Sequence, residues 1–157
     1  MSFKSRGRED GPSTVELLRR VPIFGDLKDS EIESLIAEAA EEIHSPGDVV
    51  IKDGSWLSDL YIVLHGKVEV RKKGKTIARL GEGQFFGEMA VLNTEPTGRS
   101  ADIVAVERCK CLKVKGIVWT AFLRKNPDVA IEVIRLLAAR LRRTNWALSE
   151  LQNLPSA

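Results

Sequence analysis

Short apolar runs alternate with turn residues through the middle of this chain, from Ile43 to Val114. The runs are rich in β-branched and aromatic residues, and most of the breaks hold a glycine that can form a tight turn. The predicted strands, after a first one near Ile43, are Val49–Ile51, Leu60–Leu64, Lys67–Arg71, Lys75–Leu80, Gln84–Phe86, Asp102–Ala105 and Cys109–Val114. Strands at this spacing predict a β-sandwich or jelly roll with about eight strands.

Helical signals precede the strands. Residues 1–12 mix glycine, proline and charges and predict a disordered lead-in, so we expect one domain over residues 13–157. Ser13 with Glu16, and Ser30 with Glu33, each match a helix capping box. Helical spacing of apolar residues follows both caps, at Leu17, Leu18, Ile32, Leu35, Ile36 and Ala39.

Two further helices are predicted after the strands, over about residues 117–153. Ile117 begins a short apolar helix, and Asn126-Pro127 supplies an N-cap and a first-turn proline for a long one. The apolar residues of the long helix step by three and four, as in a coiled-coil seam: Ile134, Leu137, Leu141, Thr144, Leu148 and Leu151. This pattern favours a homodimer through the helix, with packing against the chain's own strands as the alternative. The fold class is therefore α+β, mainly β.

Composition excludes several classes of protein. Of the 157 residues, 43% are apolar and 29% are charged, which is typical of a folded globular protein. A net charge of +2 is too small to indicate nucleic-acid binding, and the basic runs Arg71–Lys73 and Arg140–Arg143 are short enough to be solvated faces. Neither a membrane-spanning run nor a signal-peptide pattern is visible in the sequence, so we expect a cytoplasmic protein without a membrane partner.

The sequence gives little support for a metal site or a catalytic nucleophile. Cys109 and Cys111 share one face of a predicted strand and are expected in the core, and His44 and His65 lie in separate turns. A jelly roll is also the fold of cupin-type enzymes, but these need a cluster of histidine and carboxylate ligands inside the barrel. Since the sequence shows no such cluster, we expect neither a metal nor a catalytic residue.

One segment carries the residues for binding a phosphorylated sugar. Gly87 lets the backbone approach a ligand closely, and the run from Glu88 to Leu92 can open a helical turn whose N–H groups face an anion. Arg99 adds a planar cationic fork for phosphate oxygens, whereas Glu88 only accepts hydrogen bonds and suits ribose hydroxyls. These residues indicate one anion and one diol.

The same segment resembles the phosphate-binding cassette of the cyclic nucleotide-binding domain family. That cassette reads Phe/Ile-Gly-Glu-Leu/Met-Ala, a short loop, and Arg-Ser/Thr-Ala. The matching residues are Phe86, Gly87, Glu88, Met89 and Ala90, followed by Arg99, Ser100 and Ala101. The resemblance covers roughly residues 20–151, and the intervening loop is about two residues longer than the commonest form, with Thr97-Gly98 as the addition.

The resemblance implies a role for each site residue. Glu88 would hold the ribose 2′-hydroxyl, and Arg99, Ser100 and the N–H groups of Met89 and Ala90 would hold the cyclic phosphate. An apolar wall under the purine would comprise Ile77, Ala78, Leu80 and Phe86. On the long helix, Thr144 and Asn145 would face the adenine amino group across a dimer, and Arg140 would approach the ribose; solvated side chains are the alternative there.

The sequence therefore predicts a cAMP-binding regulatory sensor that is not an enzyme and signals through its C-terminal helix. Beyond the nucleotide it needs no cofactor, and the effector that it regulates stays unidentified. Two alternatives stay open. In the first, the sensor is selective for cGMP, because Asn145 can donate or accept a hydrogen bond and the resemblance places a Ser or Thr after the cassette arginine in cGMP-binding members as well. In the second, the domain is degenerate, which means that it keeps the fold without binding a ligand and serves as a dimerisation module.

Overall fold

The computed structural model describes residues 11–51, 59–87 and 101–152 of the chain, so most of the predicted lead-in lies outside the described residues. The helices are α1 (Thr14–Arg19), the 3-10 helix η1 (Pro22–Phe24), α2 (Asp29–Ala37), α4 (Gly116–Lys125) and α5 (Pro127–Gln152). The strands are β1 (Ala40–His44), β2 (Val49–Ile51), β3 (Asp59–His65), β4 (Val68–Lys72), β5 (Lys75–Leu80), β6 (Phe85–Phe86), β7 (Asp102–Ala105) and β8 (Cys109–Lys115). The chain forms two compact units, residues 1–121 and residues 122–157.

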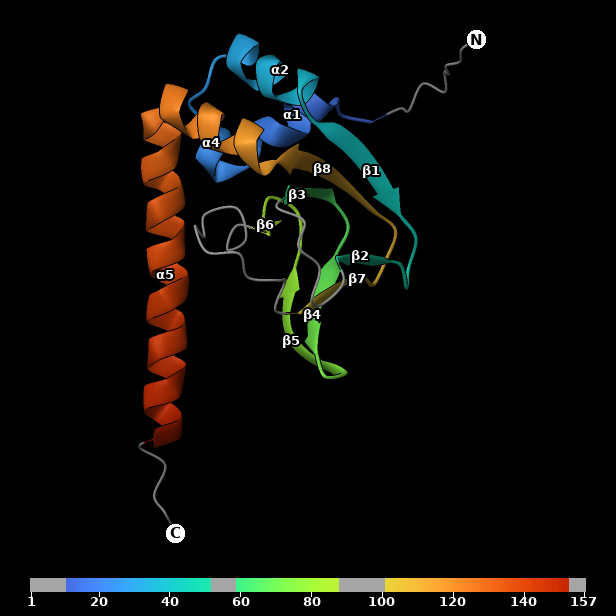
Figure 1. The fold of residues 1–157 in the computed structure, drawn as a ribbon, viewed down its shortest axis with the longest axis vertical. Coiled ribbons are helices and arrows are strands. Elements are labelled where there is room, and N and C mark those ends of the chain that lie inside the picture. Colours follow the sequence, from blue (N-terminus) through green and yellow to red (C-terminus); the bar gives the residue numbers. More distant parts are fainter. Residues whose placement is uncertain (1–10, 52–58, 88–100, 153–157) are drawn as a thin grey trace. The chain divides into compact units, whose positions relative to one another are not determined.

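The strands of the first unit form two antiparallel sheets (Figure 1). In the described residues each sheet has four strands, in the orders β1-β8-β3-β6 and β2-β7-β4-β5. Neighbours in space are seldom neighbours in sequence, which is the pattern of a jelly roll rather than of a simple meander. The predicted mainly-β fold with N-terminal helices and a long C-terminal helix is confirmed.

The first strand begins earlier than its sequence suggested. Ala39 has helical spacing, but α2 ends at Ala37 and β1 starts at Ala40. The reason is long-range pairing, because β8 offers backbone partners to the whole of β1, with Ala40 opposite Lys113 and His44 opposite Cys109. A ladder to a distant strand satisfies these backbone groups better than one more helical turn would.

The core of the roll lies between the inner faces of the two sheets. It contains Ile51, Tyr61, Val63, Val68, Phe86, Ile103, Ala105, Cys109 and Cys111. Both cysteines are free and buried, which confirms their predicted place in the core, and burial raises the pKa of the Cys111 thiol. A buried, protonated thiol behaves as a small apolar side chain and is a poor nucleophile.

The first sheet is buried on its outer face as well. Along β3, every side chain from Leu60 to Leu64 is buried, although successive residues point to opposite faces. The N-terminal helices cover the outer face, where α1 contacts β3 and the rings of Phe24 and Trp119 meet edge to face at 6.1 Å. Strand β3 therefore lies in the middle of three layers.

Of the two predicted capping boxes, one is confirmed and one is wrong. Ser13 and Glu16 form the expected reciprocal hydrogen bonds at the start of α1. At α2 the N-cap is Lys28, and the carboxylate of Glu31 accepts a hydrogen bond from its backbone N–H at 3.1 Å. Ser30 and Glu33 already lie inside this helix. The Arg19 side chain, which binds the Leu27 carbonyl at 2.9 Å and pairs with Asp29, holds the earlier start in place.

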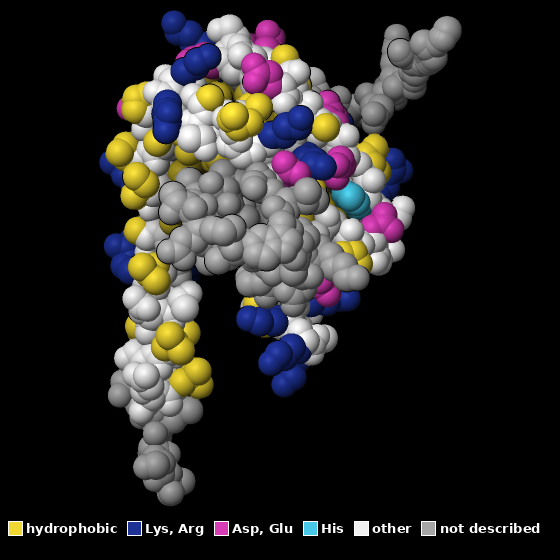
Figure 2. Space-filling model, in the orientation of Figure 1, with side chains coloured by type: hydrophobic (Ala, Val, Ile, Leu, Met, Phe, Trp, Pro, Cys, Tyr) yellow, Lys and Arg dark blue, Asp and Glu magenta, His cyan; other side chains and the backbone are white. Residues whose placement is uncertain are grey.

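The second unit is largely α5, which spans 26 residues and starts at Pro127 as predicted. Asn126 occupies the expected N-cap position, but its side-chain amide donates to the Phe122 carbonyl at 3.0 Å and so caps the end of α4. Several large apolar residues of α5 are exposed, and Figure 2 shows hydrophobic side chains along this helix. The exposed residues are Ile131, Ile134, Leu141, Trp146, Leu148 and Leu151. Among the described helices, α5 included, none combines the length and apolarity needed to cross a membrane.

Candidate functional site

The residues predicted to bind phosphate and ribose fall in a segment that the structure does not describe. Glu88, Met89, Ala90, Arg99 and Ser100 all belong to residues 88–100. The structure describes the residues on both sides of this segment, which are Phe86 and Gly87 before it and Ala101 after it. The described part of the site therefore consists of these flanks and the strands beside them.

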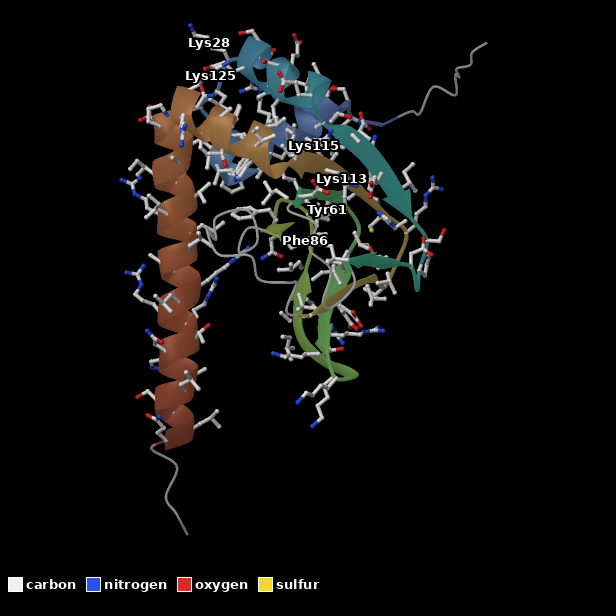
Figure 3. All side chains as sticks on the ribbon, viewed as in Figure 1. Lys28, Tyr61, Phe86, Lys113, Lys115 and Lys125 are labelled. Carbon is white, nitrogen blue, oxygen red and sulfur yellow. The ribbon has the colours of Figure 1, made fainter. Side chains whose placement is uncertain are left out.

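The leading flank is anchored in the core by Phe86. Its ring stacks on Tyr61 with ring centroids 5.0 Å apart and planes within 3° of parallel, and the two residues are cross-strand partners in β6 and β3 (Figure 3). Gly83 and Gln84 extend this pairing through hydrogen bonds to both backbone groups of Val63, at 2.9 and 2.8 Å. The backbone that leads to Glu88 is thus fixed to β3, whose residues Leu60 to Leu64 are all buried.

Gly87 directly follows this anchor and has a φ of +90°. Non-glycine residues rarely adopt this conformation, so the residue type and the backbone agree. The sequence predicted a glycine here for the start of an anion-binding turn, and the rest of that turn lies outside the described residues.

The trailing flank is anchored in the other sheet. Ala101 is buried, with 8% of its surface exposed, and it leads into β7. Strand β7 lies inside the second sheet, where it pairs with β2 on one side and β4 on the other. Residues 88–100 therefore leave an edge strand of the first sheet and return to an interior strand of the second.

The predicted apolar wall is only partly on one face. The pairing register between β4 and β5 changes by one residue, because Val70 is opposite Ala78 whereas Arg71 is opposite Thr76. Ile77 is the extra residue of this β-bulge, and it is 61% exposed. Ala78 and Leu80 share the inner face with their partners in β4, and Leu80 packs against the core that contains Phe86.

Sequence reasoning missed a charged cluster on the outer face of the same hairpin. The carboxylate of Glu69 accepts hydrogen bonds from Arg71 at 2.8 and 3.0 Å, from Thr76 at 3.0 Å and from Arg79 at 2.9 Å. The hydrogen bonds from Arg71, then that from Thr76, lower the pKa of Glu69. The bulge is what places Thr76 and Arg79 on the same face, and a period-2 pattern does not show it.

A second missed cluster lies on the inner face of the first sheet, beside the Tyr61 ring (Figure 3). Lys113, the cross-strand partner of Tyr61, lies 3.6 Å from both Glu42 and Asp59. Burial opposes its charge, but Tyr61, Glu42 and Asp59 outweigh this effect and raise the pKa of Lys113. His44 extends the cluster through a 3.0 Å contact with Glu42. In the described ranges no three His, Cys, Asp or Glu side chains are grouped to hold a metal ion.

The three site residues predicted on α5 all belong to the second unit. Thr144 and Asn145 are exposed, and Arg140 is half-buried. The Thr144 hydroxyl donates a hydrogen bond to the Arg140 carbonyl at 3.0 Å, one helical turn earlier. This bond leaves the lone pairs of the hydroxyl available to accept from a donor outside the helix.

Comparison with known proteins agrees with this fold. Residues 41–126 match the cyclic nucleotide-binding domain family. The chain is 32% identical over 132 residues to a cyclic AMP receptor protein of Thermus thermophilus, which covers 81% of this chain and 60% of the relative. It is 37% identical over 95 residues to a cAMP-dependent protein kinase regulatory subunit of Yarrowia lipolytica, which covers 59% of this chain and 25% of the relative.

A solved structure is similar as well. The crystal structure of the Thermus thermophilus catabolite activator protein superimposes with a TM-score of 0.71 at 32% identity, and the match covers 83% of this chain and 63% of that chain. This chain thus spans less than two thirds of the length of these relatives. The family match, residues 41–126, includes strands β2 to β8 and the flanks of the 88–100 segment. The chain belongs to the cyclic nucleotide-binding domain family.

Proposed function

We propose that this chain is a cAMP sensor and not an enzyme. The relatives named as a cyclic AMP receptor protein and a cAMP-dependent kinase regulatory subunit support this ligand. Glu88 accepts from the ribose 2′-hydroxyl, and Arg99, Ser100 and the N–H groups of Met89 and Ala90 bind the cyclic phosphate. These roles rest on the sequence match, because the residues themselves lie outside the described ranges.

The observation that supports this proposal best is the pair of anchors around residues 88–100. Phe86 stacks on Tyr61 in one sheet, and Ala101 is buried at the start of β7 in the other. A segment with both ends fixed loses less conformational entropy on binding a ligand than a free loop does. Gly87, at a φ of +90°, supplies the turn that directs N–H groups toward a phosphate.

Selectivity for adenine is assigned to Thr144. Its hydroxyl proton is directed to the Arg140 carbonyl, so the oxygen acts as an acceptor toward the base. Adenine presents a 6-amino donor, which this acceptor fits, whereas guanine presents a 6-oxo acceptor there, which it does not. Asn145 faces the adenine amino group together with Thr144, both across the dimer, and Arg140 approaches the ribose. Ala78, Leu80, Phe86 and the bulge residue Ile77 form the apolar wall under the purine.

We assign signalling to α5, which forms a homodimer with a second copy of the chain. Leu141, Leu148 and Leu151 are 51–65% exposed and recur at coiled-coil spacing. If the same helix contacts ligand and partner, each must change the affinity for the other by the same factor. The effector is an attached or separate protein, and no direct contact with nucleic acid is proposed.

Replacement of Arg99 tests the nucleotide site. Arg99→Ala should weaken cAMP binding, measured by calorimetry, by about 2 to 5 kcal/mol, since it removes a charge-assisted pair of hydrogen bonds. Arg124→Ala is the matched control, because Arg124 is exposed on α4. Undiminished binding by Arg99→Ala would remove Arg99 from the site. Binding of cGMP in preference to cAMP would favour the cGMP-selective alternative.

Replacement of Leu141 tests the link to assembly. Leu141→Glu should dissociate the dimer in sedimentation experiments and weaken cAMP binding by roughly 1 to 3 kcal/mol. Arg142→Glu, next to it but outside the seam, should do neither. A dimer that binds no cyclic nucleotide at all would favour the ligand-independent dimerisation module instead.

A further inference from the structure

Glu69 is a charged residue of β4 that is buried, with 7% of its surface exposed. Its neighbours Val68 and Val70 pack in the core of the roll, so the Glu69 side chain lies on the outer face of the second sheet. Within residues 11–51, 59–87 and 101–152, no other charged residue is buried to this degree. A carboxylate loses hydration when it is buried and is retained where hydrogen-bond donors replace the water. What Glu69 holds in place therefore depends on where its donors lie.

The donors of Glu69 lie on both sides of the β-bulge in the β4–β5 hairpin (Figure 1). Arg79 is the cross-strand partner of Glu69, on the side of the bulge away from the turn, and its Nε donates to Oε2 at 2.9 Å. Arg71 and Thr76 are partners of each other on the turn side. Both donate to Oε1, at 2.8 and 3.0 Å from Arg71 and at 3.0 Å from Thr76. One carboxylate therefore joins the two parts of the hairpin that the bulge separates.

The hydrogen bond from Thr76 distinguishes the bulged register from a continuous one. If the ladder continued without a bulge, Ile77 would be opposite Arg71. Thr76 would then share the inner face with Ala78, because alternate residues of a strand point to the same face. A hydroxyl on that face cannot reach Glu69 on the other. The bond from Thr76 to Glu69 therefore forms only when β5 is bulged, and it stabilises the bulge.

The hydrophobic core does little to fix this part of β5. The strand is exposed from Lys75 to Arg79, and it pairs with β4 alone among the described strands. Ile77 at the bulge and Ala78 next to it belong to the apolar wall that the proposed function places under the purine. The hydrogen bonds of Glu69 therefore fix the strand segment that carries this wall, whereas the phosphate and the ribose are assigned to residues 88–100.

We propose that Glu69 is a positioning residue for the purine base, because its hydrogen bonds hold the bulge that sets the conformation of Ile77 and Ala78. It acts through β5 and does not itself touch the ligand, since its side chain lies on the face opposite to Ala78 and Leu80. This role rests on the proposed function, because it needs a purine against that wall. Loss of a donor to Glu69 should weaken the contacts of the base and spare those of the ribose and the phosphate.

The test removes one donor on each side of the bulge, in Arg79→Met and Thr76→Val. The parent chain and each variant are titrated with cAMP by calorimetry and with ribose 3′,5′-cyclic phosphate, which lacks the base, by NMR. We expect both variants to bind cAMP about three- to tenfold more weakly than the parent and to bind the ribose phosphate equally well. Amide hydrogen exchange of β5 without ligand should be faster in both variants than in the parent.

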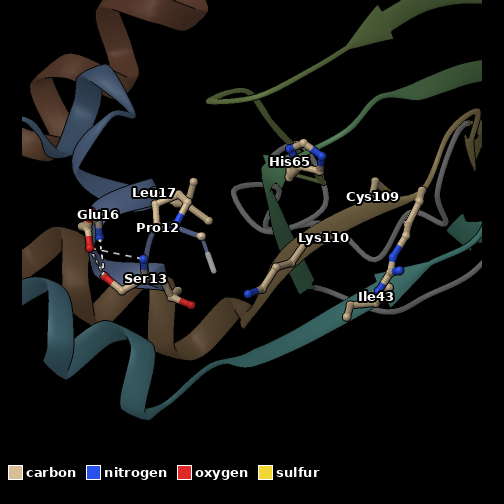
Figure 4. Close-up of a pocket in the computed structure, with 11 residues that line it drawn as sticks. Pro12, Ser13, Glu16, Leu17, Ile43, His65, Cys109 and Lys110 are labelled. Carbon is tan, nitrogen blue, oxygen red and sulfur yellow. Dashed lines mark hydrogen bonds between the residues drawn. The ribbon is translucent and has the colours of Figure 1, made fainter. Parts of the chain in front are cut away.

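Two lysine variants are matched controls for the charge lost in Arg79→Met. Lys75→Met removes an exposed cation from the same strand, and this lysine has no ion pair within the described part of the chain. Lys110→Met breaks a 2.9 Å ion pair with Glu41 in the pocket between α1 and the first sheet, which contains none of the residues assigned to the nucleotide (Figure 4). Both controls should bind cAMP as the parent does and keep its exchange rates in β5.

Equal cAMP affinity of the parent, Arg79→Met and Thr76→Val would exclude the proposed role of Glu69. Equal losses for cAMP and for the ribose phosphate would show a general loss of structure instead of a misplaced base, and unchanged exchange in β5 would show that the donors do not hold the bulge. A parent chain that binds neither ligand would refute the proposed function itself. Because the Arg79 side chain is 75% exposed, Arg79→Met should keep the parent's thermal unfolding midpoint to within about 3 °C, which separates weaker binding from loss of fold.

Discussion

Strands β3 and β5 are of similar length but are held in place by different forces. β3 is buried on both faces and pairs with β8 and β6, whereas β5 is largely exposed and pairs only with β4 in the described sheets. Burial sets the register of β3, because a shift by one residue would exchange its two apolar faces. In β5 the register depends on a tight turn and on the hydrogen bonds of Glu69. The strand proposed to contact ligand is thus the one that the core constrains least.

Replacement of the glycine in the turn at each end of β4 should give the largest difference in unfolding free energy. Gly66 has a φ of +92°, and a Cβ there would lie 2.5 Å from the Arg108 carbonyl oxygen and 2.6 Å from the Cys109 Cβ. Gly74 has a φ of +77° with open space around it. Strain and overpacking together predict that Gly66→Ala loses about 4 kcal/mol of unfolding free energy, against about 1 kcal/mol for Gly74→Ala. Denaturant unfolding measures both, and equal losses would contradict the packing argument.

Truncation of one isoleucine in each strand should give the next largest difference in unfolding free energy. Ile62 of β3 is fully buried, and Ile77 of β5 is 61% exposed. Ile62→Ala should cost about 3 kcal/mol because it leaves a cavity, whereas Ile77→Ala should cost less than about 0.5 kcal/mol. If Ile77→Ala were as destabilising as Ile62→Ala, β5 would belong to the core, and its assignment to the ligand wall would fail.

Glu69 gives a smaller, pH-dependent effect. Its pKa is lowered in the folded chain, chiefly by Arg71, so its contribution to stability is present above its unfolded pKa and is lost as pH falls through the folded pKa. The parent should therefore lose more stability than Glu69→Gln as pH falls below about 4. Thermal unfolding across this range measures the difference. Parallel pH profiles for the two proteins would show that the carboxylate contributes nothing to the hairpin.

The same contrast explains what the sequence could predict. The strands of the roll follow from apolar runs and turn glycines, and the Lys73-Gly74 turn forms with positive φ at both residues, as a two-residue hairpin requires. The bulges beside Ile77 and His65 were missed because each depends on pairing with a particular partner strand. Side-chain periodicity assumes an unbroken register, so it cannot show which residues a bulge transfers to the other face.

The candidate site was predictable to a different degree in its two parts. The motif alone indicated Phe86, Gly87 and Ala101, and the structure gives a buried Phe86, a Gly87 with a φ of +90° and a buried Ala101, whereas the predicted contacts of residues 88–100 stay a prediction. The Thr144 hydrogen bond to Arg140 and the Glu69 cluster were not apparent, because both depend on which of several polar partners a side chain selects. Such choices are made by local geometry and not by residue type.

Hydrogen exchange with and without cAMP is the sharpest test of a nucleotide site between the two anchored flanks. We expect cAMP to slow exchange of the amides of β5 and of residues 83–101, while β3 amides, already protected by burial, do not change. Mass spectrometry of peptic fragments resolves these regions in one experiment. No slowing in any fragment at saturating cAMP, or slowing confined to β3 and the N-terminal helices, would contradict a cyclic nucleotide site between the two anchored flanks.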